Sequence, residues 1–184
     1  MNREQVKSSI VQNEGSINHL YLDTRGNATI GVGQLIASVE SAKSLNLVVR
    51  ETGDLATEQE IEQEYTNIVA QKVGMVASRY KDFTKLELSQ KEIDLQLDRH
   101  IDEFVSSLER KVDNFEQFPD PAQNALLDMA FNLGVSGLVK KFPKLIQASN
   151  QQDWQTCAAE CKRRGISDQR NQETKSLFES VIQA

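Results

Sequence analysis

Two acidic residues near the N-terminus could carry out acid–base chemistry together. Glu14 stands at the end of a short helical pattern, and Asp23 comes shortly after it, immediately before an expected turn at residues 24–27. Thr29 follows on the expected returning strand and places a hydroxyl close by. One carboxyl can donate a proton while the other activates a water molecule, which is the pairing that hydrolyses a glycosidic bond. Among 27 acidic residues, however, such a pair is more often two solvated surface charges.

The glycines between these residues give the pattern more weight. Gly26 supplies the turn, and the alternating Gly31 and Gly33 leave room for a ligand or another backbone to approach the strand. The alternative is a tight hairpin that needs small residues for packing alone. The Gly-x-Gly is not a dinucleotide fingerprint, because no third glycine opens a helix after it.

The neighbouring elements would hold the two carboxylates on separate rigid supports. Asn2 and Gln5 resemble a capping pair, and Gly15 ends the helix that they start. Its apolar side would consist of Val6, Ile10 and Val11. Two short strands are expected around the Gly26-Asn27 turn, and from Ser38 onward the pattern is helical, with residues 46–57 as a long loop.

The remainder of the chain predicts a helical lobe. Helix starts are expected at the capping boxes Thr57-x-x-Glu60 and Ser89-x-x-Glu92 and at Asp120-Pro121. Residues 122–133 carry apolar side chains around most of the helix, which predicts burial on nearly all sides before Gly134 stops it. Further helices are expected from Pro143, over 154–164 with Trp154 as a core anchor, and over 170–182.

Composition excludes several classes of function. A net charge of −6 argues against nucleic-acid binding, which rests on neutralising phosphates, and no apolar run is long enough for membrane insertion. The cluster Lys162-Arg163-Arg164 is interpreted as cations at a helix end rather than a binding patch. Cys157 and Cys161 share a helix face, and are interpreted as small, partly buried residues, since a metal site would need more ligands.

The motif resembles the signature of the phage-type lysozymes, the T4-like family of glycoside hydrolases known as family 24. The residues that match in order and spacing are Glu14, Tyr21, Asp23, Gly26, Thr29, Ile30, Gly31 and Gly33. A looser similarity runs over residues 123–137, as in the family's buried central helix, and another over 154–178, with Arg170, Glu173 and Phe178 in the C-terminal pattern. The middle, residues 38–86, is longer and divergent.

The resemblance implies an α+β, mostly helical, two-lobed lysozyme fold that binds a sugar chain between its lobes. The whole chain, residues 1–184, would form one catalytic domain. Its strand-bearing lobe would span about 14–60, its divergent middle about 57–86, and its helical lobe about 87–184 together with the N-terminal helix.

The resemblance also implies roles for individual residues. Glu14 would be the general acid, and Asp23 would activate the attacking water with help from Thr29. Leu35 and Phe131 match positions that line the substrate site. Partial desolvation at a helix end would keep Glu14 protonated for this work, while a more solvated Asp23 stays ionised.

The sequence departs from the family pattern at three positions. Gln34 stands where the family usually has histidine, which removes a titrating group and should alter the pH response more than the chemistry. Glu160 and Leu145 stand where relatives often place smaller, sugar-contacting residues. His19 lies between the carboxylates in sequence, but the family pattern gives it no role.

The resulting interpretation is an inverting muramidase that cuts the β-1,4 bond between N-acetylmuramic acid and N-acetylglucosamine in peptidoglycan. No metal or organic cofactor is expected, because two carboxylates and a water molecule suffice. The alternatives are a lysozyme-like module that binds peptidoglycan or a protein without cleavage, and a hydrolase of another glycan such as chitin.

The sequence fits two biological settings. Residues 1–15 lack the apolar core and cleavage site of a signal peptide, so we expect synthesis in the cytoplasm and action on the periplasmic wall after release or non-classical delivery. A phage endolysin and a secreted antibacterial effector would both fit. The expected partners are peptidoglycan strands and an immunity or delivery protein, with the enzyme itself a monomer.

Overall fold

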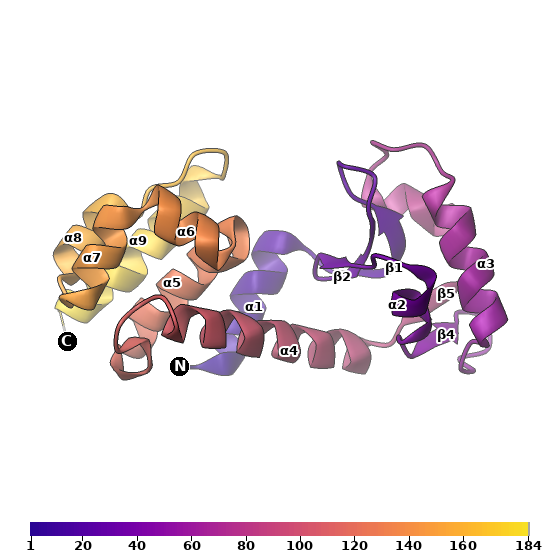
Figure 1. Cartoon of the computed structure of the whole chain (residues 1–184), viewed down its shortest axis with the longest axis horizontal. Helices are drawn as coiled ribbons and strands as arrows, with labels where there is room; N and C mark the ends of the chain where they lie inside the picture. The colour runs from indigo at the N-terminus through magenta and orange to yellow at the C-terminus, as the bar shows by residue number, and fades with distance from the viewer. Residues whose placement is uncertain (184) are drawn as a thin grey trace. The chain divides into compact units, whose positions relative to one another are not determined.

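The computed structural model describes residues 1–183, and they fold into two compact units. Of the described residues, unit 1 comprises residues 1–13 and 99–183, and unit 2 comprises Glu14–Asp98. The chain is mostly helical with small antiparallel sheets, which confirms the expected α+β lysozyme-like fold (Figure 1). None of the described helices combines the length and the apolar character needed to cross a bilayer.

Unit 2 is built on the expected hairpin. A three-stranded antiparallel sheet runs in the order β1 (Ile17–Leu22), β2 (Ala28–Gly31) and β3 (Gln34–Leu35). The turn between β1 and β2 depends on Gly26, whose φ of +85° is readily adopted only without a Cβ. A Cβ there would also lie 3.1 Å from Cγ2 of Val73, so the segment after α3 packs against this turn.

The middle of the chain differs from the expectation of continuous helix with a long loop at 46–57. Strand β4 (Leu47–Val49) pairs antiparallel with β5 (Leu86–Leu88). Leu55 returns to form an isolated bridge with Val48, so residues 47–49 and 55 of the expected loop take part in backbone pairing. The helical pattern failed here because each strand is only three residues long and its partner is distant in sequence.

The other elements of unit 2 surround these sheets. They are α2 (Val39–Lys43), α3 (Glu58–Val69) and the 3-10 segment η1 (Ala77–Phe83). The predicted capping box of α3 is present, because Glu60 N–H donates to Thr57 Oγ1 at 3.3 Å and Thr57 N–H donates to Glu60 Oε2 at 2.8 Å. Glu64, buried on the same helix, accepts the backbone N–H groups of Lys85 and Leu86 and so ties α3 to β5.

Unit 1 is formed by helices around one buried element, α5. Its elements are α1 (Arg3–Glu14, apart from its last residue), the end of α4 (Gln90–Glu109), η2 (Phe115–Gln117), α5 (Asp120–Leu133), α6 (Val135–Lys141), α7 (Pro143–Asn150), α8 (Trp154–Glu160) and α9 (Asp168–Ile182). As predicted, α5 begins at Asp120-Pro121, is buried on nearly all sides and ends at Gly134. Trp154 packs between Phe118 and Phe178, with ring centroids 5.1 and 6.4 Å away, and anchors this core.

Three expectations about unit 1 are wrong. Helix α8 ends at Glu160, earlier than the predicted 164. Arg163 is not a solvated cation at a helix end, since its side chain is almost fully buried and paired with Asp128. On α1, Val6 and Ile10 are buried as expected, but Val11 is 36% exposed.

Candidate active site

Asp23 is held by the hairpin turn that it helps to form. Its Oδ1 accepts the backbone N–H groups of Arg25 and Asn27, both at 2.8 Å. Its Oδ2 accepts the side-chain amide of Asn27 at 2.9 Å. Since each of these groups donates to the carboxylate, the turn fixes the orientation of Asp23 and stabilises its ionised form.

These contacts also determine how Asp23 titrates. Partial desolvation acts to raise the pKa of Asp23, but it is outweighed by the side-chain hydrogen bond from Asn27 and the backbone hydrogen bonds from Asn27 and Arg25, with the Arg25 charge assisting. The pKa therefore lies below its ordinary value. An ionised carboxylate can accept a proton from water, which matches the role expected for Asp23.

The strand register places Thr29 in a row across the sheet. Thr29 lies opposite Tyr21 on β1 and opposite Leu35 on β3. Directly opposed residues project from the same face of an antiparallel sheet, so these three side chains share one face. Desolvation and the nearby charge of Asp23 raise the pKa of Tyr21, so the row lies close to Asp23.

Within this row the side chains differ in exposure. Thr29 is buried, and its hydroxyl donates to the carbonyl oxygen of Asn27 at 3.1 Å, which leaves the oxygen lone pairs as acceptors. Leu35 is 57% exposed, which is high for an apolar side chain and compatible with contact to a ligand. Leu20, Leu22 and Ile30 project to the opposite face and form the buried core of unit 2.

Glu14 is the last residue of α1, where the helix gives way to the strand. Gly15 follows with a φ of +77°, which ends the helix before β1 begins at Ile17. The Glu14 side chain is exposed. Strand β1 is irregular between Ile17 and Tyr21, a feature that bends a strand between its ends.

The two strand glycines have different surroundings. A Cβ on Gly31 would lie 2.8 Å from Oε1 of Gln96, so the free space at this glycine is taken by a side chain of α4. Gly33 has no heavy atom within 4 Å of its Cβ position and is open. Gln34, which replaces the family's histidine, is half-buried, and its Oε1 has no hydrogen-bond partner.

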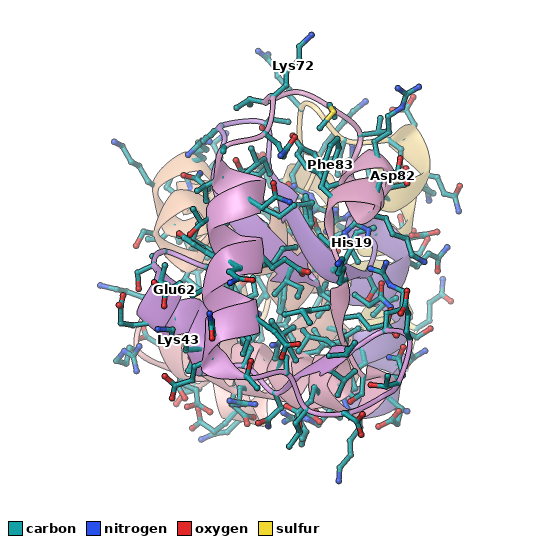
Figure 2. All side chains as sticks on the ribbon, turned by 90° about the vertical axis from the view of Figure 1, so that its right-hand side faces the viewer. His19, Lys43, Glu62, Lys72, Asp82 and Phe83 are labelled. Carbon is teal, nitrogen blue, oxygen red and sulfur yellow. The ribbon has the colours of Figure 1, made fainter. Side chains whose placement is uncertain are left out.

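His19 is buried on β1. Figure 2 shows it beside the η1 segment that carries Asp82 and Phe83. Its Nδ1 lies 3.1 Å from the carbonyl oxygen of Leu20, so the neutral ring carries its proton on Nδ1. Desolvation is the main cause that lowers the pKa of His19, with Arg50 and Lys81 contributing, so the neutral ring is favoured and a structural role is indicated.

This burial predicts a specific pH dependence of stability. Because the folded-state pKa of His19 is lowered, its contribution to the free energy of unfolding is complete above the unfolded value of about 6.5 and is lost as the pH falls through the folded value. Thermal unfolding at pH 7.5 and pH 5 should therefore show a smaller drop in Tm for His19→Gln than for the unmodified chain. Equal drops in the two proteins would contradict the prediction.

In unit 1, Phe131 is half-buried on α5 and stacks on Phe104 of α4. The ring centroids are 4.3 Å apart and the planes meet at 27°. The pair presents partly exposed aromatic surface, as expected of a residue that contacts sugar. Leu145, at a position that often contacts sugar in relatives, is fully buried, and Glu160 lies 3.8 Å from Lys144 as an exposed ion pair.

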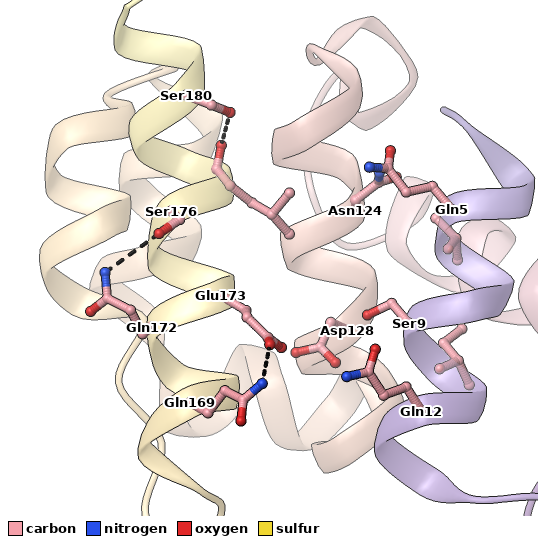
Figure 3. Close-up of a pocket in the computed structure, with 13 residues that line it drawn as sticks. Gln5, Ser9, Gln12, Asn124, Asp128, Gln169, Gln172, Glu173, Ser176 and Ser180 are labelled. Atoms are coloured by element: carbon pink, nitrogen blue, oxygen red, sulfur yellow. Dashed lines mark hydrogen bonds between the residues drawn. The ribbon is translucent and has the colours of Figure 1, made fainter.

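A buried charge network centred on Asp128 of α5 was missed from the sequence. Asp128 accepts hydrogen bonds from Arg163 at 2.5 Å, from Arg170 at 2.8 Å and from Thr174 at 3.1 Å. Asp128 forms part of a groove of about 560 Å³ between α1, α5 and α9 (Figure 3). Neutral amides and hydroxyls such as Gln12, as labelled in that figure, make up most of its polar lining.

The cysteines are buried and not joined in a disulfide. Desolvation raises the pKa of Cys157 to about 11, and that of Cys161 is raised by the same cause. Residues 1–183 contain no cluster of three or more His, Cys, Asp or Glu side chains that could hold a metal ion.

The chain matches the phage lysozyme family over residues 70–178, which is more than half of its length. No curated protein matches it. The matched range begins after α3 and extends into α9, so it does not include Glu14, Asp23 or Thr29. The chain belongs to the phage lysozyme family, and it is therefore a lysozyme-type glycoside hydrolase that degrades peptidoglycan.

Proposed function

We propose that the chain is an inverting muramidase that hydrolyses the β-1,4 bond between N-acetylmuramic acid and N-acetylglucosamine. Glu14 is the general acid, Asp23 is the general base, and Thr29 helps to hold the attacking water. The observation that carries the proposal is the Asp23 carboxylate, which three hydrogen bonds hold ionised at the edge of the sheet face bearing Thr29. The family membership supports the reaction class.

The proposed chemistry moves two protons. Glu14 gives its proton to the glycosidic oxygen as the bond to the anomeric carbon breaks. A water molecule attacks that carbon from the opposite face and loses a proton to Asp23. Glu14 is exposed at the end of α1, so a bound sugar chain can reach its carboxyl.

Leu35 and Phe131 complete the proposal as sugar-contacting residues. Leu35 offers exposed apolar surface in the same row as Thr29, and the Phe131–Phe104 pair offers aromatic surface. Apolar faces of sugar rings pack against such surfaces, while the carboxylates act at the bond between rings.

We further propose that the enzyme acts as a monomer on the periplasmic wall, as a phage endolysin or a delivered antibacterial effector. A net charge of −6 provides no electrostatic steering toward an anionic wall. A negative net charge fits release at the wall with the help of a delivery protein. An immunity protein would be the second expected partner of an effector.

The stereochemistry of the product tests the mechanism. If Asp23 activates water, the two carboxyl groups must stand roughly 6.5–9.5 Å apart in the working enzyme, and the first product is the α-anomer. Proton NMR of fresh digests of peptidoglycan, recorded before mutarotation, should show that anomer first. Initial release of the β-anomer would indicate a covalent intermediate and remove the water-activating role from Asp23. Absence of new reducing ends would favour a module that binds without cleaving.

A further inference from the structure

The side chain of Asn27 contacts the candidate base directly. Its Nδ2 donates to Oδ2 of Asp23 at 2.9 Å, while its backbone N–H donates to Oδ1 at 2.8 Å. The Asn27 carbonyl oxygen in turn accepts the Thr29 hydroxyl at 3.1 Å and the Asp23 N–H at 2.9 Å. One residue therefore contacts both groups that the proposed function assigns to the water molecule.

The number of donors distinguishes the two oxygens of Asp23. Oδ1 accepts two backbone N–H groups, from Arg25 and Asn27, which is as many as its two in-plane lone pairs can take. Oδ2 accepts one donor, the Asn27 amide, and keeps one lone pair. Oδ2 is therefore the oxygen that can take a proton from water without breaking the turn.

We infer that Asn27 is a positioning residue for hydrolysis, which directs the open lone pair of Asp23 Oδ2 toward the attacking water and sets the proton affinity of that carboxylate. The inference rests on the proposed role of Asp23 as base. The hydrogen bonds from Asn27 lower the pKa of Asp23, which keeps the base ionised under acidic conditions. The protonation of Asp23 determines the acidic limb of the pH–rate profile, so this limb should depend on Asn27.

Two substitutions separate the amide donor from the backbone of the turn. Asn27→Ala removes the Nδ2 donor but keeps the backbone N–H and carbonyl contacts. Asn27→Asp keeps the shape and places a second carboxylate against Oδ2, which should disfavour the ionised pair even more. Among the described residues, the non-glycine residues with positive φ are Asn114 and Gln152, so alanine at position 27 introduces no backbone strain.

The chain offers a matched control at Asn18. Its Nδ2 donates to the Glu87 carboxylate at 3.0 Å, so Asn18→Ala breaks the same kind of bond in the same unit without touching Asp23. Each variant would be examined by carbon NMR titration of the Asp23 carboxyl and by the pH dependence of kcat and KM on peptidoglycan.

Asn27→Ala should raise the titration midpoint of Asp23, move the acidic limb of kcat to higher pH and lower the plateau kcat roughly tenfold with little change in KM. Asn27→Asp should move the titration midpoint of Asp23 and the acidic limb of kcat further in the same direction. Asn18→Ala should change neither the titration midpoint of Asp23 nor the pH dependence of kcat. A titration and a pH profile that Asn27→Ala does not change would overturn the inference, even with Asp23 confirmed as the base.

Two other results would contradict the proposed role of Asp23 as the base. If the Asp23 titration moves in Asn27→Ala while kcat and its pH profile stay unchanged, the hydrogen bond is real but Asp23 is not the base. Full activity in Asp23→Asn would give the same answer. Either result would overturn both the inferred role of Asn27 and the mechanism on which it rests.

Discussion

Replacing Glu14 with glutamine should lower the release of new reducing ends from peptidoglycan by roughly a thousandfold, within the range expected for loss of a positioned acid. The glutamine amide has nearly the same shape but no proton to give to the leaving oxygen. Because Glu14 is exposed at the end of α1, the fold should tolerate the change.

The matched control lies on the same helix. Glu4 is an exposed carboxylate in the first turn of α1, so Glu4→Gln makes the same chemical change at a position with no proposed role. This variant should keep full activity in the reducing-end assay. Comparable activity in Glu14→Gln and Glu4→Gln would remove Glu14 from the mechanism.

The second large effect is expected on stability. Asp128→Asn should lower the free energy of unfolding by about 3–5 kcal/mol, the cost of removing one partner from a buried ion pair. Asp128 is the only carboxylate that the described contacts of Arg163 show, and the Arg163 side chain is 1% exposed. Removing the negative charge leaves the buried Arg163 guanidinium without the carboxylate that its described contacts show, and the cost of its desolvation is no longer offset.

An exposed ion pair in unit 1 provides the comparison. Asp102 accepts from Arg3 at 2.8 Å, with side chains 65% and 37% exposed respectively, and such pairs contribute about 0–1 kcal/mol. Urea unfolding of Asp102→Asn and Asp128→Asn should therefore differ by several-fold in the free energy lost. Equal losses in the two variants would show that the buried network contributes no more than a surface pair.

The hairpin could be predicted from sequence because its signals are local. The turn residues, the alternating apolar side chains and the glycines fall within one short stretch, and β1 and β2 pair across it as expected. Strands β4 and β5 could not be predicted in the same way. Leu47 pairs with Leu88, so the register depends on contacts between residues far apart in the chain.

The candidate site likewise contains residues that local sequence signals predict and contacts that they do not predict. Glu14, Asp23 and Thr29 could be proposed from residue type and spacing, but the Asn27 contact with Asp23 depends on a side-chain conformation that the sequence pattern does not specify. From the sequence, Arg163 is expected at the end of a helix, where the helix dipole favours cations. Its burial follows from Asp128, Arg170 and Thr174, which come from two other helices.

The buried thiols make this protein convenient for site-specific labelling. Cys157 is 0% and Cys161 is 2% exposed, and a pKa of about 11 leaves almost no Cys157 thiolate at neutral pH to react with maleimides. A cysteine introduced at Leu55, which is 70% exposed in unit 2, would therefore react first in the native protein. With a second introduced cysteine in unit 1, a pair of fluorophores would report the separation of the two units during wall digestion, with both natural cysteines kept in place.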